Sequence, residues 1–328
     1  MNNTLRWGII GTGSIARKCA EAFPEVDGAE LAGVASRARH TADRFGEEFG
    51  ITRRYASYQA LADDREIDIV YIATPHPFHC ENTLMCLEAG KHVLCEKPFA
   101  INAAEAEQMI NCARRHNRFL MEAMWTRFIP AVVEIRAEIE RGTIGEARMF
   151  FGNFGFRTAF DPASRLFDPA LGGGALLDIG VYPISFASML FGEPAGVTGL
   201  AQPGKTGIDE QAGIVIKYAK GEVALLSCAV STDLPDDARI CGTEGNIYIP
   251  ERCWRPTRYS IKQEGKEESR EIPIKGNGYN YQIDEVQRRV RAGEIESAIL
   301  PLEETLTIMR TMDELRRQWG VAYPGEGR

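Results

Sequence analysis

The stretch LRWGIIGTGSIA, residues 5–16, decides the fold of this chain. Its first half is an apolar run that predicts a buried strand. Its second half has the pattern G-x-G-x-x-G/A, which opens a helix directly after such a strand. Gly11 permits the tight turn, Gly13 lets the backbone approach a pyrophosphate, and Ala16 lets the helix pack closely on the strand. The stretch therefore predicts a dinucleotide site with contacts from Gly11, Thr12, Gly13, Ser14 and Ile15.

Outward from this turn, short apolar runs alternate with helical patterns as far as residue 124. The next strands are expected at Ala29–Ser36, Ile67–Thr74, Lys91–Cys95 and Phe119–Ala123. Helical patterns separate them, and one of these helices, Ala103–His116, follows Asn102 as its cap. Regular βαβ alternation predicts a parallel, doubly wound sheet, because such strands are covered by helices on both faces. We expect residues 1–124 to form this Rossmann domain.

The pattern changes after residue 124. The expected elements are a helix at Ala131–Arg141, a strand at Ala147–Phe156, a helix opened by Gly172-Gly173-Gly174, strands between Pro194 and Ile274, and helices at Tyr281–Ala292 and Leu302–Trp319. Many strands with few helices predict an α+β domain whose large, mostly antiparallel sheet carries helices on one face. The whole chain is thus expected to be an α/β protein, with a second domain at residues 125–328 for substrate binding and oligomerisation.

The end of the second strand indicates which dinucleotide binds. Sites for NAD usually place an acidic residue there, which binds the ribose 2′-hydroxyl. This chain has Ser36-Arg37-Ala38-Arg39 instead, so no carboxylate repels a 2′-phosphate. Arg37 can form paired hydrogen bonds with phosphate oxygens, and Ser36 can add one more. The sequence therefore favours NADP(H), with Arg37 rather than Arg39 as the main phosphate ligand.

Composition excludes several classes of protein. The chain has 328 residues, 44% of them hydrophobic, and a formal net charge of −8, without a run of basic residues. These features argue against nucleic acid as a partner. The apolar run near the N-terminus is too short for a signal peptide, and no window approaches the length of a membrane span, so we expect no membrane association.

The cysteines and histidines predict no metal site. None of the eight cysteines forms a Cys-x-x-Cys pair, and most lie in apolar runs. Reduced, buried thiols are typical of the cytoplasm, which is the location we expect. His76 and His79 have a spacing compatible with metal binding, but no cysteine or carboxylate cluster accompanies them.

Two further segments identify a family. They are Ala73–His79, with the sequence ATPHPFH, and Cys95–Pro98, with the sequence CEKP. Together with the glycine-rich start they resemble the glucose–fructose oxidoreductase/inositol dehydrogenase family, often called Gfo/Idh/MocA. The resemblance covers essentially the whole chain and implies an N-terminal Rossmann domain followed by a domain with a large antiparallel sheet. It also implies cofactor contacts from Thr74, Pro75, His76, His79, Glu96, Lys97, Trp125 and Arg165.

Two details within the family indicate one branch. They are the Trp-x-Arg-Phe element at Trp125–Phe128 and a tyrosine at position 182, where most members carry histidine. The resemblance implies a branch that acts on dihydrodiols or on D-xylose with NADP, and it disfavours an inositol dehydrogenase proper. It further implies that His76 lies near the nicotinamide, that His79 holds its loop, and that Arg165 reaches the cofactor or the substrate.

Alcohol oxidation with NADP requires a group that takes the hydroxyl proton. Lys97 and Tyr182 are the candidates. A free tyrosine has a pKa of about 10, and a nearby ammonium would lower it. We expect Tyr182 to exchange the proton while Lys97 stabilises the phenolate, although the two roles can be reversed. Asp178 lies four residues before Tyr182, on the same face of an expected α-helix, and binds substrate hydroxyls, orients Tyr182 or is simply a polar residue of the helix.

Aromatic side chains are expected to form the substrate pocket. Trp125 follows the last Rossmann strand, and the resemblance adds Phe154, Trp254 and Tyr279. Apolar walls suit a dihydrodiol or the flat face of a pyranose.

Four functions remain open from the sequence. They are an NADP-dependent sugar or diol dehydrogenase, a keto-sugar or carbonyl reductase of the same fold, an NAD-dependent glycosidase and a non-catalytic NADP sensor. Arg37 argues against the glycosidase, and the presence of both Lys97 and Tyr182 argues against the sensor. The exposed face of the C-terminal sheet predicts a homodimer, because large open sheets rarely stay bare.

Overall fold

The computed structural model describes residues 4–326 and divides the chain into two compact units. The first unit contains the described residues up to Trp125 together with Lys275–Thr305. The second contains Thr126–Ile274 and the described residues from Leu306 onward. A single boundary at residue 124 does not describe this division, because Lys275–Thr305 returns to the first unit.

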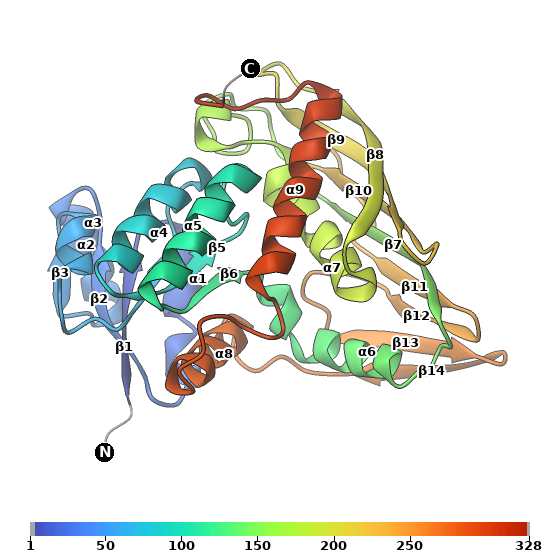
Figure 1. Cartoon of the computed structure of the whole chain (residues 1–328), viewed down its shortest axis with the longest axis horizontal. Helices are drawn as coiled ribbons and strands as arrows, with labels where there is room; N and C mark the ends of the chain where they lie inside the picture. Colours follow the sequence, from blue (N-terminus) through green and yellow to red (C-terminus); the bar gives the residue numbers. More distant parts are fainter. Residues whose placement is uncertain (1–3, 327–328) are drawn as a thin grey trace. The chain divides into compact units, whose positions relative to one another are not determined.

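The first unit is built on a six-stranded parallel sheet in the order β3-β2-β1-β4-β5-β6 (Figure 1). Its strands are β1 Leu5–Ile10, β2 Ala29–Ala35, β3 Arg53–Tyr55, β4 Ile69–Ile72, β5 His92–Glu96 and β6 Leu120–Ala123. The order reverses between β1 and β4, and ligands bind at the carboxyl ends of strands at such a switch point. Every residue of β4 and β6 is buried, which explains why apolar residues predominate in both strands.

The first unit also contains helices, most of which connect successive strands as the sequence predicts. They are α1 Ser14–Ala20, α2 Arg39–Phe49, α3 Tyr58–Ala62, α4 His79–Glu88, α5 Ala103–His116 and, from the returning segment, α8 Asn280–Arg291. The predicted cap of α5 is confirmed, because the Asn102 side chain accepts a hydrogen bond from the Glu105 N–H at 2.9 Å. Sequence patterns missed β3 and α3, which are only three and five residues long.

The second unit is built on an eight-stranded sheet in the order β14-β13-β12-β11-β7-β10-β9-β8 (Figure 1). Its strands are β7 Ala147–Gly155, β8 Pro194–Pro203, β9 Asp209–Tyr218, β10 Val223–Ala229, β11 Ala238–Gly242, β12 Gly245–Ile249, β13 Arg258–Gln263 and β14 Lys266–Glu271. All neighbours pair antiparallel except β7 and β10. The α/β class with a large, mostly antiparallel second sheet is thus confirmed.

One face of this sheet is buried and the other is open. Along β9, Ile214 and Ile216 are buried whereas Val215 is 41% exposed, as expected for a strand with one covered face. Helix α7 (Val181–Phe191) packs on the covered face, where Phe186 stacks on Phe150 of β7 with ring centroids 5.1 Å apart. The unit also contains α6 (Pro130–Glu140) and most of α9 (Leu302–Trp319).

The segment Pro169–Phe191 has the length and apolar character of a membrane span, and its most apolar 18-residue window has a mean hydropathy of 1.5. The expectation that no window approaches this length is therefore wrong. Within the described residues, 83% of its most apolar window is buried inside the protein. Burial on the covered face of the sheet accounts for its hydropathy, as it does for core helices generally.

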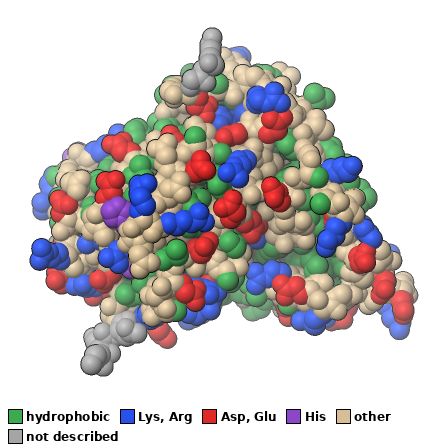
Figure 2. Space-filling view, in the orientation of Figure 1, with side chains coloured by type: hydrophobic (Ala, Val, Ile, Leu, Met, Phe, Trp, Pro, Cys, Tyr) green, Lys and Arg blue, Asp and Glu red, His purple; other side chains and the backbone are tan. Residues whose placement is uncertain are grey.

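All eight cysteines lie within the described residues and are free thiols. Seven of them are buried, as predicted, and Cys241 on β11 is half-buried. Burial raises the pKa of the Cys86 thiol to about 12, so this thiol is uncharged and unreactive near neutral pH. Acidic and basic side chains are interspersed over the surface that Figure 2 shows.

Candidate active site

The glycine turn after β1 has the geometry that a dinucleotide requires. Gly11 has φ +105°, and a Cβ added there would lie 2.6 Å from the Ala73 carbonyl oxygen, so only glycine fits. A Cβ added at Gly13 would meet no described atom within 4 Å, which leaves open space beside the start of α1. Helix α1 has no side-chain cap, so its first N–H groups are available to a phosphate. These features fit a bound pyrophosphate.

The two arginines that follow β2 differ in their contacts within the described residues. Arg39 is ion-paired with Asp43 at 2.9 Å, whereas Arg37 is exposed and forms no ion pair within residues 4–326. Ser36 is fixed beside it, because its N–H donates to the Tyr55 carbonyl at 3.1 Å. Burial raises the pKa of Tyr58, and the nearby charge of Arg37 opposes this rise. Arg37 is therefore the residue available to a 2′-phosphate.

A buried histidine links the loop after β4 to the loop after β5. His79 Nε2 lies 2.8 Å from the Thr74 carbonyl oxygen, and Nδ1 lies 2.9 Å from that of Pro98. The Asn82 amide donates to the Thr74 hydroxyl at 3.1 Å. Burial lowers the pKa of His79 despite its two carbonyl neighbours, so the ring is neutral and donates through one nitrogen. His79 thereby fixes the backbone at Thr74, directly before Pro75, and at Pro98.

His76 is buried too, with its ring centroid 5.7 Å from that of His79. Among the described residues, no group of three or more His, Cys, Asp or Glu side chains could hold a metal ion.

The Glu-Lys-Pro segment is anchored through its glutamate. Glu96 ends β5 and is 5% exposed. Its carboxylate accepts hydrogen bonds from the Tyr71 hydroxyl and, at 3.1 Å, from the backbone N–H of Lys97. Burial and the charge of Glu96 raise the pKa of Tyr71 well above its usual value, so Tyr71 remains a donor. The half-buried Lys97 follows at the carboxyl end of β5, and its bond to Pro98 is cis.

Trp125 and Tyr279 form one aromatic wall in the first unit. Their rings stack with centroids 4.4 Å apart and an interplanar angle of 10°, and each residue is 6% exposed. Trp125 follows β6, whereas Tyr279 belongs to the returning segment that precedes α8. The two residues are far apart in sequence, so only the return of Lys275–Thr305 brings them together.

Asp178 and Arg165 form a two-point ion pair in the second unit. Arg165 donates to the two carboxylate oxygens of Asp178 at 2.8 and 3.3 Å. Asp178 is 4% exposed, whereas the side chain of Arg165 is 54% exposed. Residues Leu176–Gly180 form a π-helical turn, so the expectation that Asp178 and Tyr182 share the face of a regular α-helix is wrong. This π-helical turn packs closely on the sheet. A Cβ added at Gly180 would lie only 3.0 Å from Cys228 Sγ.

Tyr182 lies in an aromatic cluster with two other residues expected in the pocket. Phe154 stacks on Trp254 with ring centroids 3.8 Å apart and an interplanar angle of 4°. Tyr182 meets Phe154 edge to face, with centroids 5.4 Å apart. Phe154 and Tyr182 are buried, and Trp254 is half-buried. The cluster thus joins a tyrosine ring to two stacked apolar rings.

The structure thus gathers the expected residues into two sets. The first unit holds the glycine turn, Arg37, the Thr74–His79 loop, Lys97 and the Trp125–Tyr279 pair; the second unit holds Arg165, Asp178, Tyr182, Phe154 and Trp254. Sequence reasoning missed Tyr71, whose only signal is a hydroxyl within an otherwise apolar strand. It also missed Asp209, which caps the π-helical turn from β9 and has no local signal.

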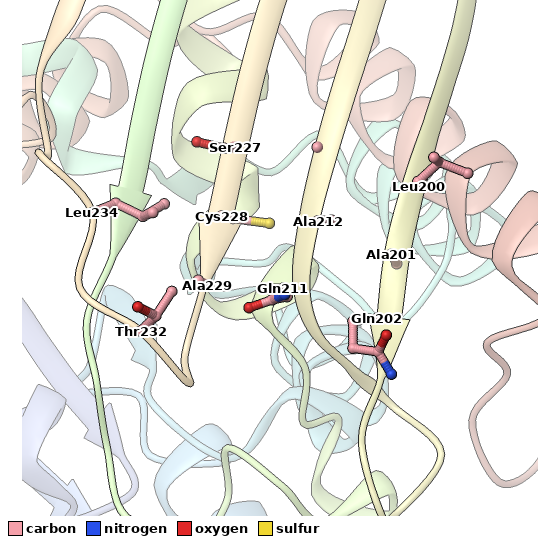
Figure 3. Close-up of a pocket in the computed structure, with 11 residues that line it drawn as sticks. Leu200, Ala201, Gln202, Gln211, Ala212, Ser227, Cys228, Ala229, Thr232 and Leu234 are labelled. Carbon is pink, nitrogen blue, oxygen red and sulfur yellow. The ribbon is translucent and has the colours of Figure 1, made fainter.

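A groove of about 450 Å³ lies elsewhere, across β8, β9 and β10 (Figure 3). Leu200, Gln211 and Ser227 are among the residues that line it, and none of the expected site residues does.

Comparison with known families matches both halves of the chain. Residues 5–124 match the GFO/IDH/MocA oxidoreductase family with an NAD-binding Rossmann fold. Residues 132–248 match the GFO/IDH/MocA C-terminal domain.

Similar proteins and structures cover nearly the whole chain. Trans-1,2-dihydrobenzene-1,2-diol dehydrogenase of Xenopus tropicalis is 39% identical over 97% of this chain and 99% of its own. The Homo sapiens protein of the same name is 36% identical over 99% of both. An aldose-aldose oxidoreductase from Caulobacter crescentus has a TM-score of 0.88 at 27% identity, covering 96% of this chain and 97% of its own. A 3-ketoreductase from Actinomadura kijaniata, solved with NADP and TDP-benzene, has a TM-score of 0.85 at 27% identity, covering 96% and 98%.

Proposed function

Because the chain belongs to the Gfo/Idh/MocA oxidoreductase family, we propose that it is an NADP(H)-dependent dehydrogenase that acts on a CH–OH group of a cyclic diol or a sugar. The observation that carries this proposal is the aromatic cluster of Phe154, Trp254 and Tyr182, in which two stacked apolar rings lie beside the tyrosine that would exchange the proton. Such a surface suits the flat face of a dihydrodiol ring or of a pyranose.

The preference for NADP rests on Arg37. Its exposed guanidinium follows β2 where NAD enzymes place a carboxylate, and it can form a forked pair of hydrogen bonds with a 2′-phosphate. Gly11 and Gly13 supply the turn and the open approach to the pyrophosphate. Thr74, Pro75, His76 and Glu96 would line the nicotinamide side of the site, and His79 would hold them in place. The structurally similar ketoreductase was solved with NADP, which supports the same choice here.

In the proposed chemistry, the hydride and the hydroxyl proton of the substrate alcohol go to different groups. Bound NADP would supply the hydride acceptor for the substrate carbon, so that the alcohol becomes a carbonyl. Tyr182 takes the hydroxyl proton, and the ammonium of Lys97 favours the phenolate form of Tyr182 and hydrogen-bonds the reacting oxygen. The reverse assignment of Lys97 and Tyr182 uses the same atoms. Solved variants of the similar ketoreductase replace a lysine by alanine or glutamate, or a tyrosine by phenylalanine.

Asp178 would orient the substrate through a second hydroxyl. Its carboxylate is buried and held by Arg165, so it can accept a hydrogen bond in a fixed direction. The side chain of Arg165 is half exposed, so it would reach the cofactor or the substrate while it remains paired with Asp178. Trp125 and Tyr279 supply a further apolar wall.

Reduction of a keto-sugar is the second candidate, and the likeness to the 3-ketoreductase favours it. It uses the same groups in the opposite direction, with Tyr182 or Lys97 donating the proton.

We further propose that the protein is a homodimer that forms through the open face of the second sheet. Phe151, Leu225 and Val215 are direct neighbours across β7, β10 and β9, and they are 37%, 36% and 41% exposed. Leu200 on β8 is 85% exposed beside the groove that Figure 3 shows. A continuous apolar surface of this kind is typical of a protein interface. Free, buried thiols fit a reducing compartment, so we propose a cytoplasmic location.

The first experiment follows NADPH absorbance with purified protein. Its panel contains D-xylose, D-glucose, inositols and a cyclic trans-diol, each with NADP and with NAD. We expect turnover of a pentose or a diol with NADP preferred. Turnover only in the direction of carbonyl reduction would favour the second candidate. Release of sugar from a glycoside without net NADPH change would indicate a glycosidase. Tight NADP binding without turnover of any substrate would indicate a sensor.

A further inference from the structure

Asp209 is a buried carboxylate that the proposed chemistry does not use. It is the first residue of β9 and is 0% exposed. Burial of a charged group is costly unless hydrogen bonds compensate it. Part of this compensation comes from a distant segment, because Asp209 Oδ2 accepts the backbone N–H of Leu176 at 2.6 Å.

Leu176 begins the π-helical turn that contains Asp178 and leads into Tyr182. The first N–H groups of a helix lack partners within the helix, and a negative charge is favoured beside them. No side chain at the start of this turn provides a cap. Asp209 therefore caps the turn from another element of the fold.

The preceding glycine turn is enclosed by the same carboxylate and by the C-terminal segment. A Cβ added at Gly174 would lie 2.6 Å from Asp209 Oδ1 and 3.2 Å from the Tyr323 hydroxyl. That hydroxyl donates a hydrogen bond to the Gly173 carbonyl. Gly174 also has φ +120°, which other residues rarely adopt. The turn is thus fixed in one tight conformation, with Asp209 on one side and Tyr323 on the other.

Tyr323 is in turn held by its own neighbours. Its N–H donates to Glu326 at 2.9 Å, Glu326 pairs with Arg316 at 2.7 Å, and the Arg316 guanidinium lies 4.9 Å from the centre of the Tyr323 ring. The segment after α9 is therefore a fixed support for the glycine turn.

The same turn also supports the loop that carries Arg165. The N–H of Gly174 donates to the Leu166 carbonyl at 3.0 Å, and the N–H of Gly173 donates to the Asp168 carbonyl at 3.0 Å. The glycine turn thus holds the backbone directly after Arg165, and the turn itself lies shortly before Asp178.

From these contacts we infer that Asp209 and Tyr323 are positioning residues of the active site, which act through the Leu176 N–H and the Gly173 carbonyl to fix the π-helical turn bearing Asp178. The catalytic consequence rests on the proposed function. The structural consequence does not, since it concerns the conformation of residues 173–178 alone.

The structural test is hydrogen exchange of the amides of residues 173–178, followed by mass spectrometry on the full chain. Asp209→Ala removes the oxygen that accepts the Leu176 N–H, and Tyr323→Phe removes one hydroxyl and leaves the ring. Each variant should speed exchange in this segment about tenfold or more, as expected when a hydrogen bond to a charged or buried group is lost. Unchanged protection in both variants would overturn the inference.

Matched controls come from a different part of the second unit. Glu138 is a buried carboxylate of α6 that accepts the Thr143 hydroxyl at 2.5 Å, and Tyr259 is a buried tyrosine of β13. Glu138→Ala and Tyr259→Phe should lower the melting temperature without changing exchange at residues 173–178. If they speed exchange there as much as Asp209→Ala does, the effect is general loosening and the inference is wrong.

The functional test separates turnover from cofactor binding. Asp209→Ala and Tyr323→Phe should lower kcat about tenfold or more, while the Kd for NADP stays within about twofold of the wild-type value. A wild-type kcat in variants whose exchange has increased would overturn the positioning role. If the wild-type protein turns over none of the substrates, the proposed function fails, and the exchange result still decides whether Asp209 and Tyr323 fix the turn.

Discussion

At the residue scale, each proposed role depends on whether a side chain is already engaged. Arg37 and Arg39 are two positions apart, yet Arg39 pairs with Asp43 and Arg37 has no ion pair within the described chain. Glu96 is likewise committed to Tyr71 and to the Lys97 backbone. These contacts give Glu96 a structural role in anchoring the Glu-Lys-Pro segment.

Replacement of Arg37 should change the choice of cofactor. Arg37→Ala removes a charge-assisted pair of hydrogen bonds to the 2′-phosphate, so the Kd for NADP should rise about 10- to 100-fold. The Kd for NAD should change little. Titration of intrinsic fluorescence with each cofactor measures both values. Arg39→Ala is the control and should leave both unchanged; equal weakening of NAD and NADP by Arg37→Ala would contradict the assignment.

Removal of either proposed acid–base group should abolish most turnover without loss of the cofactor. Lys97→Met and Tyr182→Phe should each lower kcat by about 10²- to 10⁴-fold. The Kd for NADP should stay close to its wild-type value, because the glycine turn and Arg37 are intact. Steady-state kinetics together with NADP titration checks both statements. Near-normal turnover in either variant excludes that residue from the chemistry.

At the element scale, helix starts show how local and distant caps differ. Helix α5 is capped by Asn102, the residue directly before it. The π-helical turn at Leu176 is capped by Asp209, which lies 33 positions later in the chain. The first arrangement follows from a sequence pattern, and the second follows only from the way β9 packs beside the turn.

Loss of the local cap should cost a modest amount of stability. Asn102→Ala leaves the Glu105 N–H without its partner and should lower the free energy of unfolding by about 1 kcal/mol. Urea denaturation of the purified protein measures it. Gln108→Ala, on the exposed face of the same helix, is the control and should be close to neutral. A cost for Asn102→Ala no larger than that of the control would show that the cap is not used.

The distant cap should make stability depend on pH. Burial raises the pKa of Asp209 to about 7, although the Leu176 N–H and the charge of Arg316 oppose this rise. Tyr323 and Cys228 also lie nearby, and burial raises the pKa of each well above its usual value, so neither ionises near neutral pH.

Between the unfolded pKa of about 4 and pH 7, the folded state holds a proton on Asp209 that the unfolded state has lost. Stability from this group is therefore greatest at low pH and falls as pH rises to 7. The melting temperature of the wild type minus that of Asp209→Asn should decline from pH 4.5 to 7.5. A difference that is constant or rises over this range would contradict the assignment.

At the scale of the whole molecule, the fold provides two separate sets of groups. The first unit carries the cofactor-binding turn and Lys97, and the second carries Tyr182, Asp178 and an open sheet face. The apolar row of Phe151, Leu225 and Val215 crosses the centre of that face. Solvent exposure of such a row is unfavourable, which is the reason for proposing a dimer.

A charge in this row should separate the subunits. Leu225→Asp places a carboxylate between Phe151 and Val215, and its desolvation would oppose association. We expect the wild-type protein to have twice the 36.4 kDa mass of one chain in light scattering at micromolar concentration, and the variant to have the single mass. Gln108→Asp, at an exposed position of α5 in the first unit, is the control. A monomeric wild type would contradict the proposed interface.

The amino-acid sequence by itself determined the elements whose signals are local. The glycine turn at residues 11–16, the buried strands β1 and β4 and the Asn102 cap all depend on neighbours a few positions away, so pattern and propensity suffice to predict them. The alternation of strands and helices likewise predicts both sheets. The short elements β3 and α3 have too few residues to show a period.

Only the tertiary structure decided the features that join distant segments. The return of Lys275–Thr305 to the first unit stacks Tyr279 on Trp125. Packing of Gly180 against Cys228 accompanies a π-helical turn where an α-helix was expected. Asp209 caps that turn from β9. The physical reason is the same in each case, since burial and hydrogen bonding are satisfied by whichever groups the fold brings close, regardless of their separation in the chain.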